Sequence, residues 1–157
     1  MKRILAISAI AVGTFIFAGS AMAATKTSNV LVQANVAAVC SAITAPATVT
    51  FVLDPSVGGN VVVSNNVTFR CSNGTGYALT NNAGLNSGSC AGSNCMTDGA
   101  NFINYSIALG GTAVGAGTGM GAGQDKTVTM DATVASADYV NAVPGAYSDT
   151  MVLTLTY

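Results

Sequence analysis

The chain closes with GAYSDTMVLTLTY, residues 145–157, in which apolar side chains recur at every second position from Met151 to Tyr157. One phase holds Met151, Leu153, Leu155 and Tyr157, and the other holds Thr150, Val152, Thr154 and Thr156. A period of two is typical of a β-strand that buries one face. No residue follows to form a neighbouring strand, so we expect a β-sandwich that lacks its last strand.

Six runs upstream also have the composition and spacing of strands, and turn-forming residues separate them. They are residues 30–43, 48–53, 61–71, 77–81, 102–109 and 127–134, and the terminal strand is expected over 147–157. Val and Thr favour strands, whereas Asn and Gly favour the turns between them. Because no capped run with helical apolar spacing follows residue 23, the sequence predicts an all-β domain.

The first 23 residues have the pattern of a secretory signal peptide. Lys2 and Arg3 precede an apolar stretch, and the small residues of AMA (21–23) suit signal peptidase. An uncleaved membrane anchor is the alternative, but Gly, Thr and Ser interrupt the stretch and its apolar part is shorter than a membrane span. We expect cleavage after Ala23, and no membrane insertion of the remaining chain.

The rest of the chain carries few charges. Its basic residues are Lys26, Arg70 and Lys126, its acidic residues are six Asp, and it has no Glu, His or Trp. Nucleic-acid binding needs clustered Lys and Arg, so it is not expected. Steering of a partner by charge is disfavoured for the same reason. Partners should therefore bind through apolar surface or through the backbone.

Four cysteines in an exported chain are expected to form disulfides, and four allow three pairings. Cys90 and Cys95 lie in one Gly/Ser/Asn-rich loop and can close locally, which leaves Cys40 with Cys71. The longer loop should contribute about 3–4 kcal/mol and the shorter one about 2 kcal/mol. Zinc is a weak alternative, because the spacing lacks paired CxxC motifs and no His is present.

Enzymatic chemistry is disfavoured because the usual bases are missing. A two-Asp hydrolase or a Ser–Lys site would have to use residues such as Asp98, Asp125 or Asp138, but Asp in turns usually bonds nearby backbone. The segment DATVASAD (131–138) lacks the alternating oxygen ligands of a calcium loop. We expect no enzyme activity and no cofactor.

A glycine-rich segment, GGTAVGAGTGMGAGQ (110–124), has glycines at close spacing, as phosphate-binding loops do. Such a loop also needs a following Lys-Ser/Thr and the N-terminus of a helix. Neither follows here, so we expect a mobile surface loop.

Several quoted stretches together resemble the spore coat U-like pilins of the archaic, Csu-type chaperone–usher pathway. NVLVQANVAAVC (29–40) is similar to the leading donor segment and first Cys of that family, and TVTFVLDPS (48–56) to its F-G-x-x-D-P element. VTFRCSNGTGYAL (67–79), CMTDGANFINYSIAL (95–109) and PGAYSDTMVLTLTY (144–157) resemble its later motifs. Val52 in place of a common Gly, the additional Cys90/Cys95 pair and the missing Trp depart from the family pattern.

The resemblance implies an incomplete immunoglobulin-like sandwich that polymerises by donor-strand complementation. Residues 24–36 would be the donor segment and 37–157 the pilin domain. The inserting side chains would be Val30, Val32, Ala34 and Val36. The groove and the chaperone-contacting strand would use Tyr147, Met151, Leu153, Leu155 and Tyr157. The implied partners are identical or related subunits, a periplasmic chaperone and an outer-membrane usher, and the implied location is a surface fibre that supports adhesion and biofilm formation.

The sequence also allows two other functions. A fibre-tip adhesin of the same system would not need a donor segment and commonly carries a separate binding domain. A free secreted carbohydrate-binding module or enzyme commonly presents aromatic platforms, but the few aromatic residues here lie mostly on strand-like runs. For residues 30–39 the simplest alternative is the first strand of a complete domain.

Overall fold

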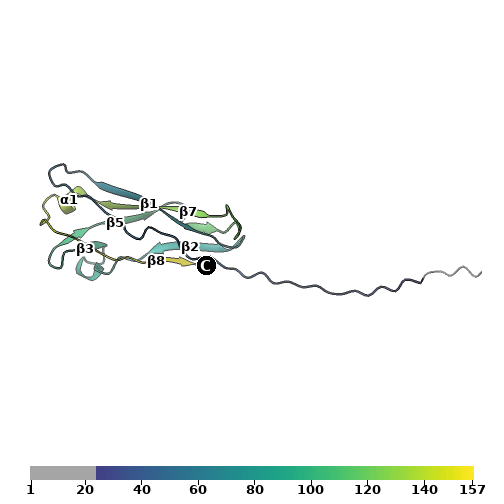
Figure 1. Cartoon of the computed structure of the whole chain (residues 1–157). Helices are drawn as coiled ribbons and strands as arrows, with labels where there is room; N and C mark the ends of the chain where they lie inside the picture. Colours follow the sequence, from purple (N-terminus) through teal and green to yellow (C-terminus); the bar gives the residue numbers. More distant parts are fainter. Residues whose placement is uncertain (1–23) are drawn as a thin grey trace, which may run out of the picture. The chain divides into compact units, whose positions relative to one another are not determined.

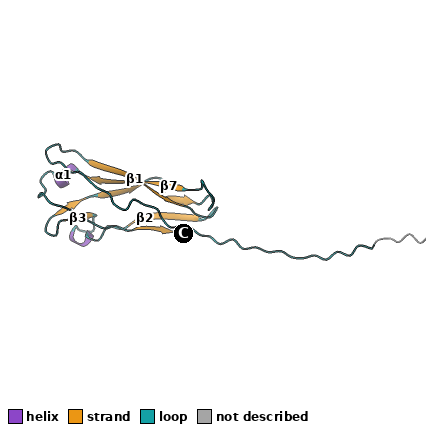
Figure 2. Ribbon diagram, viewed as in Figure 1, coloured by secondary structure: helices purple, strands orange, loops and turns teal. Residues whose placement is uncertain are grey.

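The structure, a computed structural model, describes residues 24–157, so the predicted signal peptide at 1–23 lies outside the described residues. Two units divide the described residues, 24–34 and Asn35–Tyr157. The second unit is mostly β, with one helical turn, α1 (Ser136–Tyr139), and one 3-10 turn, η1 (Ser87–Ser89) (Figure 2). Its strands are β1 (Val61–Phe69), β2 (Gly76–Asn81), β3 (Cys95–Thr97), β4 (Phe102–Asn104), β5 (Ser106–Leu109), β6 (Val114–Ala116), β7 (Lys126–Val134) and β8 (Leu153–Thr156).

The strands form small antiparallel sheets (Figure 1). One three-stranded sheet has the order β1-β7-β5, and a second has the order β6-β2-β8. The longest pairing is between β1 and β7, from Val61 opposite Val134 to Phe69 opposite Lys126. A third sheet contains only β3 and β4. In the second sheet β8 pairs with β2 alone, so the terminal strand lies at an edge.

The core lies where the two three-stranded sheets face each other. The strands alternate as expected for sheets with one buried face, and β7 buries Val128, Met130, Ala132 and Val134. Their partners from the other strands include Phe69 and Tyr77, whose rings meet edge to face at 4.8 Å. One core cluster joins Cys71, which follows β1, to residues of β1, β2 and β7: Val67, Phe69, Tyr77, Leu79, Val128 and Met130.

Both disulfides that the sequence predicts are present in the structure. Cys40–Cys71 fastens the start of the domain to the chain just after β1. Beside it, Thr44 and Thr68 exchange two backbone hydrogen bonds of 2.8 Å, but this contact is an isolated bridge rather than a strand. Cys90–Cys95 closes the loop that leads into β3.

Several sequence predictions were wrong in detail. Residues 30–43 and 48–53 form no strand, because no neighbouring backbone pairs with them over their length. The run 102–109 is divided at Tyr105 into β4 and β5, which belong to different sheets. The glycine-rich segment 110–124 is not only a loop, since it contains β6, which pairs with β2. The expected all-β domain also contains the short helical turns α1 and η1, which the search for long helical patterns could not detect.

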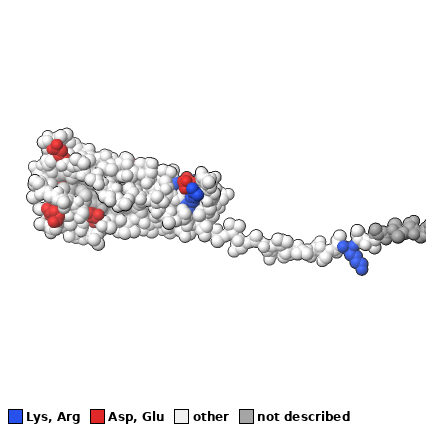
Figure 3. All heavy atoms as spheres, viewed as in Figure 1, with Lys and Arg blue, Asp and Glu red and all other residues white. Residues whose placement is uncertain are grey.

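Charged atoms occupy little of the surface of the domain in Figure 3. Red acidic atoms gather toward the end that holds α1 and β3, and blue and red atoms lie together at the opposite end. The ion pair of Arg70 with Asp125 joins Nε to Oδ1 at 2.6 Å. None of the helices in residues 24–157 has the length and apolar character needed to cross a membrane.

Gly117 is a position where a side chain should be costly. Its amide donates to the carbonyl of Thr75 at 2.8 Å, and a Cβ added to it would collide with the carbonyl oxygens of Cys71 and Ser72. Because backbone cannot move as a side-chain end can, Gly117→Ala should reduce the free energy of unfolding by about 1–3 kcal/mol in urea titration. Gly121→Ala is the matched control, since a Cβ there has no atom within 4 Å. Equal stability of the two variants would contradict the expectation.

Candidate functional site

An open groove of about 820 Å³, lined mostly by apolar residues, lies between the terminal segment of the chain and the segment that precedes β1. One bank consists of residues between 43 and 53, and the other of residues between 145 and 153. The floor comes from β5 and β7 through Ile107, Met130 and Ala132. Met96 and Tyr105 complete the lining.

Both banks contain backbone groups that have no backbone partner within residues 24–157. The carbonyls of Thr150 and Val152 accept hydrogen bonds of 2.9 and 3.0 Å from the chain just after β2. Alternate residues of an extended chain direct their backbone groups to opposite sides, so those of Asp149 and Met151 face the groove. Within residues 24–157, neither residue has a backbone partner, and residues 45–53 make no backbone hydrogen bond at all. An extended chain laid in the groove could therefore bond to either bank.

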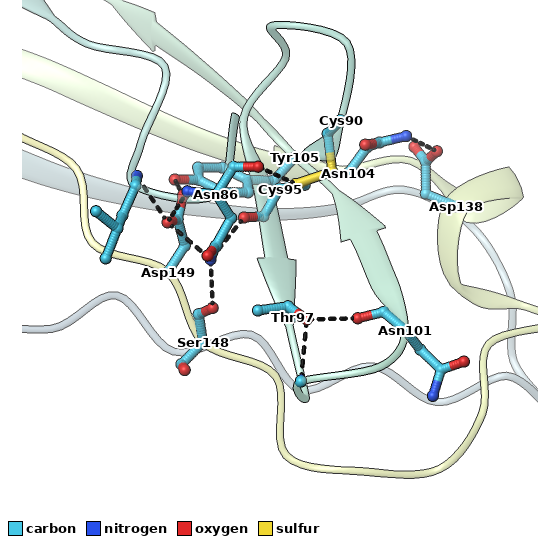
Figure 4. The surroundings of a disulfide bond; sticks show 12 residues. Asn86, Cys90, Cys95, Thr97, Asn101, Asn104, Tyr105, Asp138, Ser148 and Asp149 are labelled. Carbon is cyan, nitrogen blue, oxygen red and sulfur yellow. Dashed lines mark hydrogen bonds between the residues drawn. A yellow bond between two sulfur atoms is a disulfide. The ribbon is translucent and has the colours of Figure 1, made fainter. Parts of the chain in front are cut away.

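Asp149 fixes the position of the terminal bank (Figure 4). Its Oδ1 accepts hydrogen bonds from the amides of Leu85 and Asn86 at 3.0 and 3.2 Å and from Nδ2 of Asn86 at 3.0 Å. Its Oδ2 accepts a hydrogen bond of 2.7 Å from the hydroxyl of Tyr105. Asn86 also donates through Nδ2 to the carbonyl of Ser148 at 3.1 Å. One carboxylate thus connects the bank to the loop after β2 and to the residue between β4 and β5.

The same contact affects the acidity of Tyr105. Burial, and then the hydrogen bond to the Asp149 carboxylate, raises the pKa of Tyr105 to about 12. Both effects favour the neutral phenol over the phenolate.

Tyr105→Phe should lower the free energy of unfolding at neutral pH by about 1–2 kcal/mol, since it removes a partly exposed hydrogen bond to a charged group. The Tyr105 pKa is raised in the folded chain, so the hydroxyl stabilises fully below pH 10 and loses this effect as pH rises toward 12. The variant should therefore lose less stability than the wild type over that interval, measured by urea titration at each pH. Tyr157→Phe, at a side chain 61% exposed, is the control and should leave neutral-pH stability unchanged.

Three of the five residues predicted for the terminal strand lie in the groove: Tyr147, Met151 and Leu153. Leu155 instead packs against the core. Tyr157 follows the end of β8 at Thr156 and is 61% exposed, and its role at the groove stays a prediction.

Sequence reasoning missed Met96, Tyr105 and Ile107 as groove residues. Tyr105 and Ile107 fall in a run that was expected to be one strand, and its alternation did not show which of its faces meets the groove. Met96 lies on β3, a strand too short for its alternation to be recognised.

The four residues predicted to insert into a neighbouring subunit lie in a segment without secondary structure, residues 24–39. Val30, Val32 and Val36 are 82, 86 and 86% exposed, and Ala34 is exposed as well. Their role as a donor strand stays a prediction.

The Asp residues considered for catalysis all accept hydrogen bonds from other residues of the domain. Asp98 accepts hydrogen bonds from the side chain and amide of Asn101 and from the amide of Ala100, and these lower the pKa of Asp98 to about 2. The hydrogen bond and charge of Arg70 lower the pKa of Asp125. Asp138 accepts a hydrogen bond of 3.3 Å from Asn104. Such contacts are those of turn and surface residues.

The geometry defines a class of protein: a mostly β domain of small antiparallel sheets with an apolar groove along an unpaired strand edge. The Spore Coat Protein U domain family matches residues 26–154, and the chain belongs to this family. No curated protein matches the chain significantly. Family membership confirms the resemblance found in the sequence, together with the prediction that the chain is not an enzyme.

Among solved structures, the chain is similar to one in the crystal structure of the CsuC–CsuE chaperone–tip adhesion subunit pre-assembly complex from archaic chaperone–usher Csu pili of Acinetobacter baumannii. The two chains are 19% identical with a TM-score of 0.53, and the match covers 78% of this chain. It covers 40% of the other chain, so this chain spans less than half the length of its solved relative. The likeness concerns the fold.

Proposed function

We propose that the chain is a structural pilin of a surface fibre, and that its groove receives the N-terminal segment of another copy. The observation that carries this proposal is that the backbone groups of Asp149, Met151 and residues 45–53, on the two banks of the groove, have no backbone partners within residues 24–157. An inserted strand would satisfy them and complete the immunoglobulin-like sandwich that the sequence predicts to be incomplete. The subunit's own N-terminal segment would fill the next groove in the same way.

The donor segment and the groove agree in length and in pattern. Val30, Val32, Ala34 and Val36 span seven residues on one face, as do Tyr147, Asp149, Met151 and Leu153 on the terminal bank. The three valines and Ala34 are uncharged and suit the apolar side chains that make up most of the lining. The opposite face of the donor segment is mixed, with Leu31 beside polar residues, and would face away from the core.

We place the donor segment antiparallel to the terminal bank, because one register then matches side-chain size to space. Ala34, the smallest of the four, would lie opposite Asp149, where the hydrogen-bonded Tyr105 ring also occupies the groove. In this register Val32 lies opposite Met151. A parallel arrangement would put Val32 opposite Asp149 and is disfavoured.

The register makes Ala34 a sensitive position. Ala34→Leu should reduce polymer yield strongly, because the added atoms meet a site already filled by Tyr105, and overpacking of this kind costs about 1–3 kcal/mol. Val32→Leu is the control, since the flexible Met151 side chain opposite can adjust. Polymer yield is measured by gel electrophoresis of unheated samples. Equal yields from the two variants would contradict the antiparallel register.

The remaining steps of assembly follow from the family resemblance. Before polymerisation the groove would be covered by a strand of a periplasmic chaperone, and the subunit would pass through an outer-membrane usher to the cell surface. The CsuC–CsuE complex, described as a chaperone–subunit pre-assembly complex, supports this order of events. We assign the chain to the fibre shaft, because a tip subunit would not need the donor segment.

Cross-linking in trans tests the proposal. Cells that express Val32→Cys and Met151→Cys as two separate chains, with the chaperone and usher, should form a disulfide-linked dimer whose peptides join positions 32 and 151. Gln33→Cys with Met151→Cys is the control, because position 33 belongs to the opposite face. A chain with both Val32→Cys and Met151→Cys that cross-links only internally, with no dimer in the mixed cells, would overturn the proposal.

A further inference from the structure

Methionine is concentrated in the groove. Residues 24–157 contain four methionines, and three of them, Met96, Met130 and Met151, line the groove. Met130 is 1% exposed, whereas Met96 and Met151 are only partly buried. Met120, outside the groove, is 42% exposed. The chain thus holds two methionines at an open apolar site, with one buried and one exposed methionine available for comparison.

We propose that Met96 and Met151 form an oxidation site that is accessible only while the groove is empty, and that their conversion to sulfoxides prevents a donor strand from binding. This inference rests on the proposed function. The oxidant is a hypohalous acid such as hypochlorous acid. Each thioether loses two electrons and gains one oxygen, while chlorine accepts the two electrons and leaves as chloride with release of one proton.

The chemical consequence follows from the position of the two side chains. A sulfoxide is polar and accepts hydrogen bonds, whereas a thioether is apolar and adapts its shape to a partner. Met151 would face Val32 of the donor, which offers no hydrogen-bond donor from its side chain. Burying the sulfoxide there without a partner costs free energy that a thioether does not cost.

A bound donor strand should in turn protect the groove methionines from oxidation. A donor strand that fills the groove covers Met96 and Met151, so oxidation should proceed only in the fraction of chains whose groove is empty. Met120 should react at the same rate in both states because it is outside the groove, and Met130 should react slowly in both because it is buried.

The test uses the Val32→Asp chain of residues 24–157, separated from the chaperone, as recipient, so that its groove is empty and it cannot donate to another copy, and a synthetic peptide of residues 28–38 as donor. With peptide at about ten times its Kd, hypochlorite oxidation at Met96 and Met151 should slow about tenfold relative to Met120, as measured by peptide mass spectrometry. After oxidation in the absence of peptide, the Kd should rise roughly tenfold or more. Recipients that also carry Met96→Leu and Met151→Leu should keep their affinity after the same treatment, whereas Met120→Leu should give no such protection.

The outcomes separate this inference from the proposed function. If the peptide fails to bind the untreated recipient in native mass spectrometry, the proposed function is overturned and this inference with it. If the peptide binds but leaves Met96 and Met151 as reactive as before, or binds the doubly oxidised chain with unchanged Kd, the inference alone is overturned.

Discussion

The Val32→Asp chain is expected to accumulate as a soluble one-to-one complex with the chaperone and never as polymer. Burial of a valine contributes roughly 1.5–3 kcal/mol, and an unpaired carboxylate in an apolar groove costs several kcal/mol more. The lost burial and the buried charge weaken every junction between subunits, so fibre growth should stop at the first junction. The fold of the subunit should survive, since Val32 lies outside the unit Asn35–Tyr157.

Gln33→Asp is the matched control for this change. It introduces the same charge one residue further along, on the face of the donor segment that would point away from the core, and its polymers should form normally. Electron microscopy of cells and co-purification with the chaperone measure the two results. Heat-resistant polymers of Val32→Asp would contradict the donor role of the N-terminal segment.

The second large effect is expected at Leu153, which contacts both the groove and the core. Its side chain lines the groove and packs against the core cluster formed by β1, β2 and β7. Leu153→Asp should therefore destabilise the domain by more than about 4 kcal/mol, the range of exceptional single substitutions. Neither a chaperone complex nor polymer should be recovered, and the chain should be degraded in the periplasm.

Thr154→Asp controls for the charge, because Thr154 is exposed and its neighbour Leu153 points inward. Its recovery with the chaperone should match that of the wild type. If Leu153→Asp yields as much soluble, folded protein as Thr154→Asp, the core does not need the apolar side chain of the terminal strand. The contrast between Val32→Asp, which folds but does not assemble, and Leu153→Asp, which does neither, distinguishes a contact between subunits from one within a subunit.

The sequence predicted best those strands whose partners lie in the same domain. β1, β2 and β7 begin and end within two residues of the expected ranges 61–71, 77–81 and 127–134. Their alternating side chains are buried by each other, so the local pattern and the final structure agree.

The predicted runs without strands failed for one physical reason. In residues 48–53 the predicted alternation is present, since Val49, Phe51 and Leu53 are partly buried while Thr50 and Val52 are exposed. A strand nevertheless needs hydrogen bonds to a neighbour, and this segment has none in the described part of the chain. The terminal strand was expected over 147–157 but is observed only over Leu153–Thr156. Residues 147–152 lack a neighbouring strand on their groove side. A period of two indicates that a segment can be a strand, but the identity of its partner is not encoded locally.

The groove itself was predictable only in part. The family resemblance pointed to Tyr147, Met151 and Leu153, whereas Met96 and Tyr105 come from segments far away in sequence. Asp149 was visible as part of a family motif, but its link to Tyr105 and to the loop after β2 depends on the tertiary structure.

The Cys40–Cys71 disulfide has a mechanical consequence for a fibre built as proposed. Tension would enter each subunit through its N-terminal segment and leave through the strand beside the groove, so the pulling force first reaches the domain at Cys40. The disulfide transmits that force directly to Cys71. The chain between the two cysteines, a sequence separation of 31 residues, therefore cannot be pulled straight. At roughly 3.3–3.6 Å per residue, each oxidised subunit should lengthen by about 100–110 Å less than a reduced one when it unravels under load. A single oxidised bond near the point of attachment would thus limit how far every link of the fibre can stretch.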